Sequence, residues 1–106
     1  SLFIAGAGMS AHLAGVIAAH TTLPVIAVPI DASSLSGIDA LMSMVQMPPG
    51  IPVATMGIGK AGAKNAGLLA AEILSISEPD LIDKLKSYRQ DMRKTVLEAD
   101  ESIRKL

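Results

Sequence analysis

The sequence predicts an α/β domain built around a parallel β-sheet. Three short apolar runs alternate along the chain with three segments of helical pattern, and the second run is rich in β-branched residues. The second run is continuous rather than alternating in polarity, which is typical of a strand buried on both faces. This order implies right-handed crossovers that place helices against the faces of the sheet. A long, charged segment at the end of the sequence is predicted to add one more helix.

The first predicted unit is a strand, a helix and a second strand. The strand covers Leu2–Ala5 and ends at Gly6, and the helix covers Ser10–His20. The second strand covers Pro24–Ile30, where valine and isoleucine dominate, as expected for residues that fit a pleated sheet.

The next elements repeat this order. A helix is predicted over Gly37–Gln46, and Ser34 or Ser36 is expected to cap it because a serine hydroxyl accepts a hydrogen bond from a free backbone N–H. A third strand over Ile51–Ile58 and an alanine-rich helix over Ala61–Leu74 complete the pattern.

The last helix begins at Pro79 and carries most of the charge of the chain. We therefore divide the sequence into a partial α/β domain, residues 1–75, and a C-terminal helix, residues 76–106. Spacings of three and four residues place one narrow apolar seam along this helix. The helix is long for so small a domain, so we expect it to pack on a neighbouring subunit; packing on its own domain is the alternative. The seam comprises Leu81, Leu85, Tyr88, Met92, Val96, Ala99, Ile103 and Leu106.

Three parallel strands make an incomplete sheet. The first strand is expected at an edge, although it is as apolar as a central strand. We infer that additional strands, from another segment or another chain, complete the sheet.

The composition excludes several classes of protein. A net charge of -1 provides no general attraction to nucleic acid or to acidic lipid, and the absence of cysteine excludes disulfides and thiolate metal sites. The apolar stretch from Leu2 to Ala19 is interrupted by three glycines, Ser10 and His12, so we interpret it as buried structure rather than a membrane span. We expect a cytoplasmic protein that binds neither nucleic acid nor membrane.

The segment Gly6–Ala11 is the first candidate site. Glycines between a strand and a helix let backbone N–H groups approach an anion at the helix N-terminus. The pattern matches the dinucleotide fingerprint, and Asp31 follows the next strand where a ribose-binding acid belongs. Dinucleotide binding and a purely structural tight turn both remain open on this pattern.

His12 is the second candidate, because it lies early in the first helix, where open α/β sheets bind their ligands. An imidazole there can donate to a carboxylate or move a proton. His20, at the other end of the helix, is better explained by its interaction with the negative helix terminus. The sequence contains no nucleophile elbow, and its histidines and carboxylates show no metal-ligand spacing, so no serine hydrolase and no metal site are expected.

The loop from Val45 to Val53 is the third candidate. Its three prolines and one glycine predict a stiff connection, so it is expected to form a fixed wall rather than a moving lid. Gln46 and Met47 can line a pocket there or take part in a subunit contact.

Several short segments occur in an order that is more specific than any one of these motifs. Ala11-His12-Leu13 and Gln46-Met47-Pro48 are the most specific. The others are Ile4–Gly8, Leu23–Ile26, Val28-Pro29, Ser34-Leu35, Gly37, Asp39, Leu41, Gly50–Thr55 and Asn65–Ala71. In this order, which is unbroken up to Leu74, they resemble the bacterial carboxyaminoimidazole ribonucleotide mutase family.

The resemblance implies a flavodoxin-like three-layer α/β/α fold, of which three strands are present, with residues 1–75 as part of the catalytic domain. It implies an octamer with active sites between subunits. The implied reaction belongs to purine biosynthesis and moves a carboxylate from the exocyclic nitrogen of an aminoimidazole ribonucleotide to a ring carbon, without metal or organic cofactor. The alternatives are a direct aminoimidazole ribonucleotide carboxylase, a dinucleotide-binding fragment, and a non-catalytic assembly module.

The resemblance also assigns residues. His12 matches the second active-site histidine of the family and is the catalytic candidate. Met9 and Ser10 stand where the family usually has small residues, and Met9 would narrow the carboxylate pocket; Ala14 replaces the usual proline. The candidate substrate-binding residues are Ala7, Gly8, Met9, Ser10, Leu13, Ser34, Gln46, Met47 and Pro48.

Two segments of the family have no counterpart in the sequence. One is a Gly-Ser-x-Ser-Asp loop for phosphate and ribose, and the other is a Ser-Ala-His-Arg segment with the principal proton-transfer histidine. The 106-residue polypeptide alone is therefore expected to be inactive.

Overall fold

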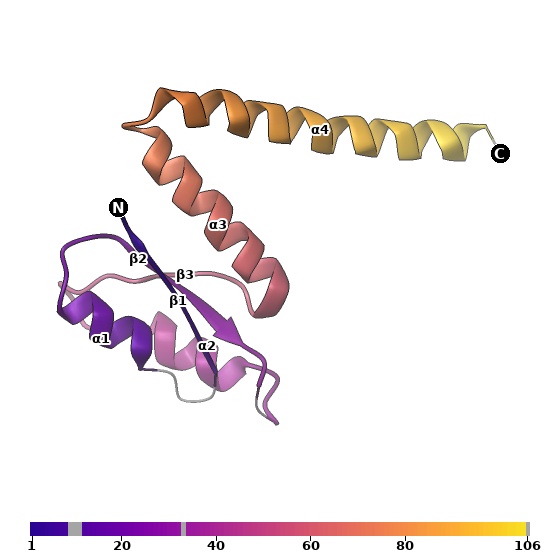
Figure 1. Cartoon of the computed structure of the whole chain (residues 1–106). Helices are drawn as coiled ribbons and strands as arrows, with labels where there is room; N and C mark the ends of the chain where they lie inside the picture. Colours follow the sequence, from indigo (N-terminus) through magenta and orange to yellow (C-terminus); the bar gives the residue numbers. More distant parts are fainter. Residues whose placement is uncertain (9–11, 33, 106) are drawn as a thin grey trace. The chain divides into compact units, whose positions relative to one another are not determined.

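The computed structural model describes residues 1–8, 12–32 and 34–105. The chain forms two compact units, Ser1–Ala70 and Ala71–Leu106, so the division falls a few residues before the one expected from the sequence. Helix α3 (Gly59–Ser75) runs from the first unit into the second. Figure 1 shows the elements of both units.

The first unit contains a parallel sheet with the strand order β1-β2-β3. Strand β1 (Phe3–Gly8) pairs along its whole length with β2 (Val25–Ile30), from Phe3 opposite Val25 to Gly8 opposite Ile30. Strand β3 (Ala54–Thr55) pairs with the other side of β2. The parallel sheet and the edge position of β1 confirm the sequence prediction, and Phe3 and Ile4 on that edge are 42% and 49% exposed.

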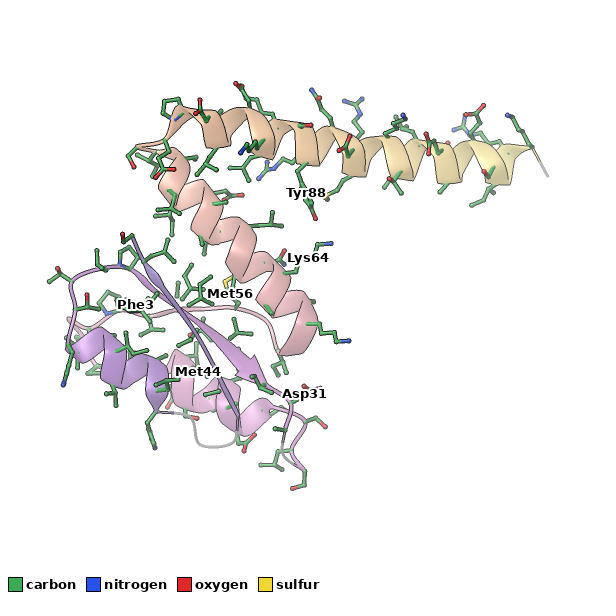
Figure 2. The ribbon with its side chains drawn as sticks, viewed as in Figure 1. Phe3, Asp31, Met44, Met56, Lys64 and Tyr88 are labelled. Carbon is green, nitrogen blue, oxygen red and sulfur yellow. The ribbon has the colours of Figure 1, made fainter. Side chains whose placement is uncertain are left out.

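Helices α1 (Leu13–Ala19) and α2 (Ile38–Val45) lie on one face of the sheet, and the first part of α3 lies on the other (Figure 1). Small residues let these layers approach closely. Met44 of α2 is the largest side chain in the cluster between the helices and the sheet (Figure 2). The other buried members of that cluster are Ala5, Ala14, Ala18, Val25 and Ala27. Buried Gly62, Ala66 and Ala70 recur every four residues and form the inner face of α3.

The end of β1 differs from the prediction. The strand does not stop at Gly6 but continues to Gly8, so the first half of the predicted strand-to-helix turn is part of the sheet; residues 9–11 lie outside the described residues. A glycine suits this position because Ala32 approaches the backbone closely: a Cβ atom on Gly8 would lie 3.1 Å from Cβ of Ala32.

The third strand is much shorter than the predicted Ile51–Ile58. Only Ala54 and Thr55 pair with β2, and the N–H of Met56 adds one more bond, to the carbonyl of Ala27 at 2.9 Å. Pro52 has no backbone N–H, so it cannot donate a hydrogen bond to β2, and the regular pairing does not extend to the segment before Ala54.

The predicted serine cap of α2 is also wrong. Gly37 precedes the helix with φ 87°, and no side chain caps it. Ser36 has φ 57°, whereas a capping serine needs an extended backbone. Gly37 is required instead: a Cβ atom there would lie 2.6 Å from Cγ2 of Ile58.

The second unit consists of the end of α3 and the long helix α4 (Pro79–Arg104), whose start at Pro79 confirms the prediction. Arg89 pairs with Glu72 at 3.0 Å, so the first half of α4 is tied to α3. Three ion pairs spaced by four residues support the second half, which contains no buried residue. Among the described residues, no helix is both long and apolar enough to cross a membrane.

Candidate functional site

The carboxyl ends of β1 and β2 hold the first group of predicted site residues. Ala7 lies opposite Pro29 and is packed against the core cluster, so its side chain points inward and only its backbone is available at the edge. Gly8 is half-buried beside Ala32, and Ser34 is exposed in the following loop. Met9 and Ser10 lie outside the described residues.

His12 stands at the start of α1. Its carbonyl accepts a hydrogen bond from the N–H of Val16 at 2.9 Å, and its imidazole is exposed and does not cap the helix. Leu13, the next residue, is 49% exposed. The imidazole is therefore available to a ligand.

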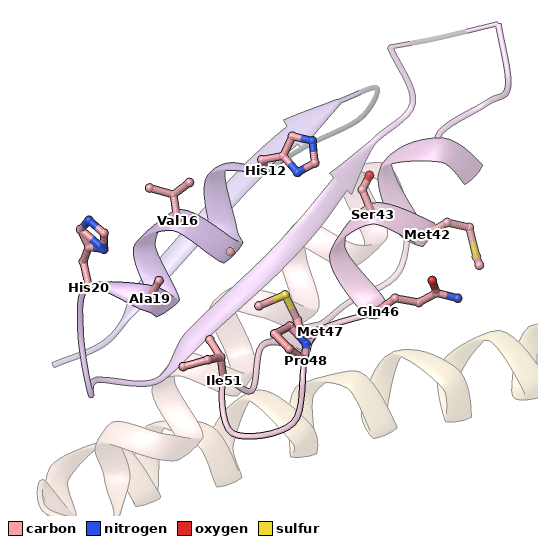
Figure 3. Close-up of a pocket in the computed structure, with 11 residues that line it drawn as sticks. His12, Val16, Ala19, His20, Met42, Ser43, Gln46, Met47, Pro48 and Ile51 are labelled. Carbon is pink, nitrogen blue, oxygen red and sulfur yellow. The ribbon is translucent and has the colours of Figure 1, made fainter.

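A groove of about 540 Å³ runs between α1 and α2 (Figure 3). One wall is a single face of α1, from His12 at one end to His20 at the other. The opposite wall comes from α2 and from the loop after it, with Met47 and Ile51 in the middle of the groove. The complete lining is His12, Gly15, Val16, Ala19, His20, Met42, Ser43, Gln46, Met47, Pro48 and Ile51.

The groove brings together only some of the predicted residues. His12 and the Gln46-Met47-Pro48 segment line it, whereas Ala7, Gly8 and Ser34 do not. The reason is the direction of the helices. Because α1 and α2 run opposite to the strands, the segment after α2 lies at the amino end of the sheet, while Gly8 lies at the carboxyl end. The predicted site residues therefore lie toward two opposite ends of the strands.

The sequence interpretation missed most of the α1 wall. Gly15, Val16, Ala19 and His20 follow His12 at three, four, seven and eight residues, which is the spacing of one helix face. This periodicity was available in the sequence. Met42, Ser43 and Ile51 carried no comparable signal, since their place depends on how α2 packs beside α1.

The groove is lined mainly by apolar groups, with a few polar side chains among them. Its described lining contains no carboxylate, lysine or arginine, and its polar groups are two imidazoles, the Gln46 amide and the Ser43 hydroxyl. The hydroxyl of Ser43 already donates to the carbonyl of Asp39 at 2.7 Å. Such a site can move protons and hold neutral molecules, but by itself it offers no cation to a phosphate. Among the described residues, no group of three or more metal-binding side chains gathers.

Comparison with known proteins decides which family the chain represents. The family model described as AIR carboxylase matches residues 1–95. The chain belongs to the AIR carboxylase family. The α/β architecture and the long final helix agree with the flavodoxin-like fold of that family.

Several relatives within the AIR carboxylase family carry one name, N5-carboxyaminoimidazole ribonucleotide mutase. The protein of Bacillus subtilis is 57% identical over 102 residues, which is 96% of this chain and 63% of the relative. The protein of Pyrococcus abyssi is 62% identical over 88% of this chain and 52% of its own length. The protein of Escherichia coli is 54% identical over 92% of this chain and 57% of its own length. The chain thus spans less than two thirds of these relatives.

Proposed function

We propose that this chain is part of an N5-carboxyaminoimidazole ribonucleotide mutase of purine biosynthesis. The observation that carries the proposal is the 57% identity to the Bacillus subtilis mutase over 96% of the chain. The reaction would break the bond between the exocyclic nitrogen and the carboxylate and form a bond from the same carbon to the imidazole ring. A proton would move from the ring carbon to the nitrogen, so no oxidant, metal or organic cofactor is required.

His12 is the residue that we propose takes part directly. Its exposed imidazole can donate a hydrogen bond to the migrating carboxylate or transfer a proton. The backbone of Ala7 and Gly8, with Leu13 and Ser34, would hold the nucleotide at the carboxyl end of the sheet. Met9 and Ser10, which lie outside the described residues, are also proposed to bind substrate. Apolar walls, such as those beside His12, would exclude bulk water and hold neutral carbon dioxide close to the ring while the carboxylate is transferred.

A chimera tests the proposed function. In it, the 102 matched residues of this chain replace their counterparts in the Bacillus subtilis protein. We expect the chimera to convert the carboxyamino nucleotide to the carbon-carboxylated product, measured by chromatographic separation of the two nucleotides. A folded chimera that binds the substrate but produces none of this product would contradict the proposal.

A direct aminoimidazole ribonucleotide carboxylase is the second candidate, because the matching family model carries that description. The same chimera separates the two functions. Turnover of aminoimidazole ribonucleotide with carbon dioxide, and none of the carboxyamino nucleotide, would favour the carboxylase.

The isolated 106-residue polypeptide should not convert the carboxyamino nucleotide to product. It contains neither Gly-Ser-x-Ser-Asp nor Ser-Ala-His-Arg, and the described groove offers no cation for the substrate phosphate. We expect no product above background in the chromatographic assay under conditions in which the chimera is active. Measurable turnover by the purified polypeptide would refute this expectation.

We further propose that the protein acts in the cytoplasm as a homo-oligomer, an octamer in the complete form, with sites shared between subunits. Two features support this. The Gln46-Met47-Pro48 segment follows α2 toward the amino end of the sheet, whereas Gly8 lies at the carboxyl end, and a second copy could bring such groups to one nucleotide. The α4 segment within residues 76–106 also exposes an apolar seam, with Met92 52% and Val96 68% exposed, suited to a neighbouring subunit.

Changing that seam should weaken assembly. Burying an apolar side chain in such an interface contributes about 1.5–3 kcal/mol of favourable free energy. Replacing Met92 and Val96 together by glutamate would remove this contribution for both side chains. We expect a smaller particle by light scattering after gel filtration. Gln90→Glu is the matched control: Gln90 is exposed and stands about 200° around the helix from Met92. Equal masses for all three proteins would argue against docking through this seam.

A further inference from the structure

The apolar seam of α4 changes its surroundings halfway along the helix. In the first half, Leu81, Leu85 and Tyr88 are half-buried. Residues 91–104 are all exposed, although the seam continues through them. Its members in this second half are Met92, Val96, Ala99 and Ile103. Within the second unit, the described residues leave this half of the seam uncovered.

The exposed half of the seam has the spacing of a two-stranded coiled coil. Its four residues are separated by four, three and four positions, as in the heptad pattern that keeps two helices in contact. Arg93 and Asp100 are seven positions apart and therefore flank the seam on the same side. The other flank holds Thr95 and Ser102, which are uncharged. One flank thus carries one charge of each sign, and the other carries none.

The carboxylate of Asp100 can accept a second cation. It pairs with Nε of Arg104, one turn further along the helix, at 3.0 Å, and 54% of the aspartate side chain is still exposed. An ionised carboxylate has about four acceptor positions, so one arginine does not saturate it. The hydroxyls of Thr95 and Ser102, by contrast, donate to carbonyl groups of their own helix, both at 3.0 Å. Only the charged flank therefore offers groups for new ionic contacts.

Two antiparallel copies of this segment would bring opposite charges together. A two-fold axis across an antiparallel pair sets each flank against the same flank of the other helix. When Met92 of one copy meets Ile103 of the other, Arg93 of each copy lies beside Asp100 of the other. The ion pair thus forms twice, once on each side of the axis.

Other arrangements of the two helices lack these contacts. Sliding one helix by seven residues brings the two Arg93 side chains together, or the two Asp100 side chains, and like charges repel. In a parallel pair, the charged flank faces the opposite flank of the partner, where Thr95 and Ser102 carry no charge. The charges therefore favour one orientation and one register.

We propose that the second half of α4 binds the same segment of a second copy in antiparallel orientation, with Arg93 of each copy paired to Asp100 of the other. The apolar residues provide the attraction, and the ion pairs select the orientation rather than adding much affinity. Four apolar residues from each copy make a small interface, so this dimer is weak. The inference rests on the homo-oligomer proposed above and adds the partner surface; it does not depend on the mutase reaction.

Charge reversal in the full 106-residue chain tests the pairing. The dissociation constant of the dimer is measured by sedimentation velocity over a series of concentrations. Arg93→Glu and Asp100→Lys each turn two attractive pairs into two repulsive ones, and we expect the dissociation constant of each variant alone to rise about tenfold. An equal mixture of the two variants should recover most of the wild-type affinity, because both ion pairs of the mixed dimer again join opposite charges.

Lys94→Glu is the matched control for the arginine variant. It makes the same change of charge as Arg93→Glu, but Lys94 lies on the face of α4 away from the seam, about 200° around the helix from Met92. It should leave the dissociation constant unchanged.

Three results would overturn the proposal. They are a wild-type chain that does not associate, single charge variants that associate like the wild type, and a mixture as weak as the single variants. If glutamate at Met92 and Val96 lowers the mass while the charge variants do not, the seam docks on another surface of the neighbouring subunit. The homo-oligomer then stands and the antiparallel pair falls, whereas turnover by the chimera is a separate measurement that neither outcome changes.

Discussion

Gly62→Ala is expected to destabilise the first unit by about 3 kcal/mol, toward the upper end of what overpacking costs. A Cβ atom on Gly62 would overlap the carbonyl group of Gly57 and lie 3.1 Å from its Cα. The obstacle is backbone rather than the end of a flexible side chain, so the first turn of α3 must shift for the methyl group to fit. That shift would separate α3 from the turn that follows β3.

Urea unfolding followed by circular dichroism measures this effect. The matched control is Gly67→Ala in the same helix, where the added methyl group meets nothing within 4 Å. It should stabilise the chain by about 0.5–1 kcal/mol, because alanine is the better helix former. Similar unfolding midpoints for the two variants would show that the Gly57–Gly62 contact does not constrain α3.

The order of the elements was predictable because it depends on local pattern. The run from Val25 to Val28 is fully apolar and mostly β-branched, and it forms the central strand with both faces buried. Pro79 begins α4 as expected, since its fixed φ suits the first helical turn and its missing N–H would have had no partner there.

The errors occur where tertiary contacts override local preference. Serine is a good capping residue, but Ser36 has a left-handed backbone, and the helix start is occupied by Gly37, where a Cβ atom would lie 2.6 Å from Cγ2 of Ile58. Gly8 looks like a turn residue, yet it pairs with Ile30 because the sheet accepts a residue without a side chain. In both cases the deciding atom belongs to a residue more than twenty positions away in the sequence.

In the candidate site, too, some residues follow from local sequence pattern and others depend on tertiary packing. His12 was predictable from its place after the first strand, and the rest of its helix face follows from the period of α1. The meeting of His12 with Gln46, Met47 and Pro48 depends on the packing of α2 beside α1, for which no short-range pattern exists. The separation of Gln46, Met47 and Pro48 from Gly8 depends on the direction of α2, which runs opposite to the strands.

The largest effect on catalysis is expected for His12. In the chimera, His12→Gln should lower kcat/KM by about a hundredfold or more, the usual contribution of a positioned acid or base. Glutamine keeps a hydrogen-bonding group of similar length but cannot titrate, so a loss in kcat rather than in KM would indicate proton transfer or stabilisation in the transition state.

His20→Gln is the matched control for the His12 variant. His20 lines the same groove but follows the last turn of α1, at the far end of the helix from His12. If proximity to the carboxyl edge of the sheet is what makes an imidazole useful, the His20 variant should retain most of the activity. Equal losses at both positions would mean that the groove needs its histidines for shape or stability, and His12 would then have no special role in the reaction.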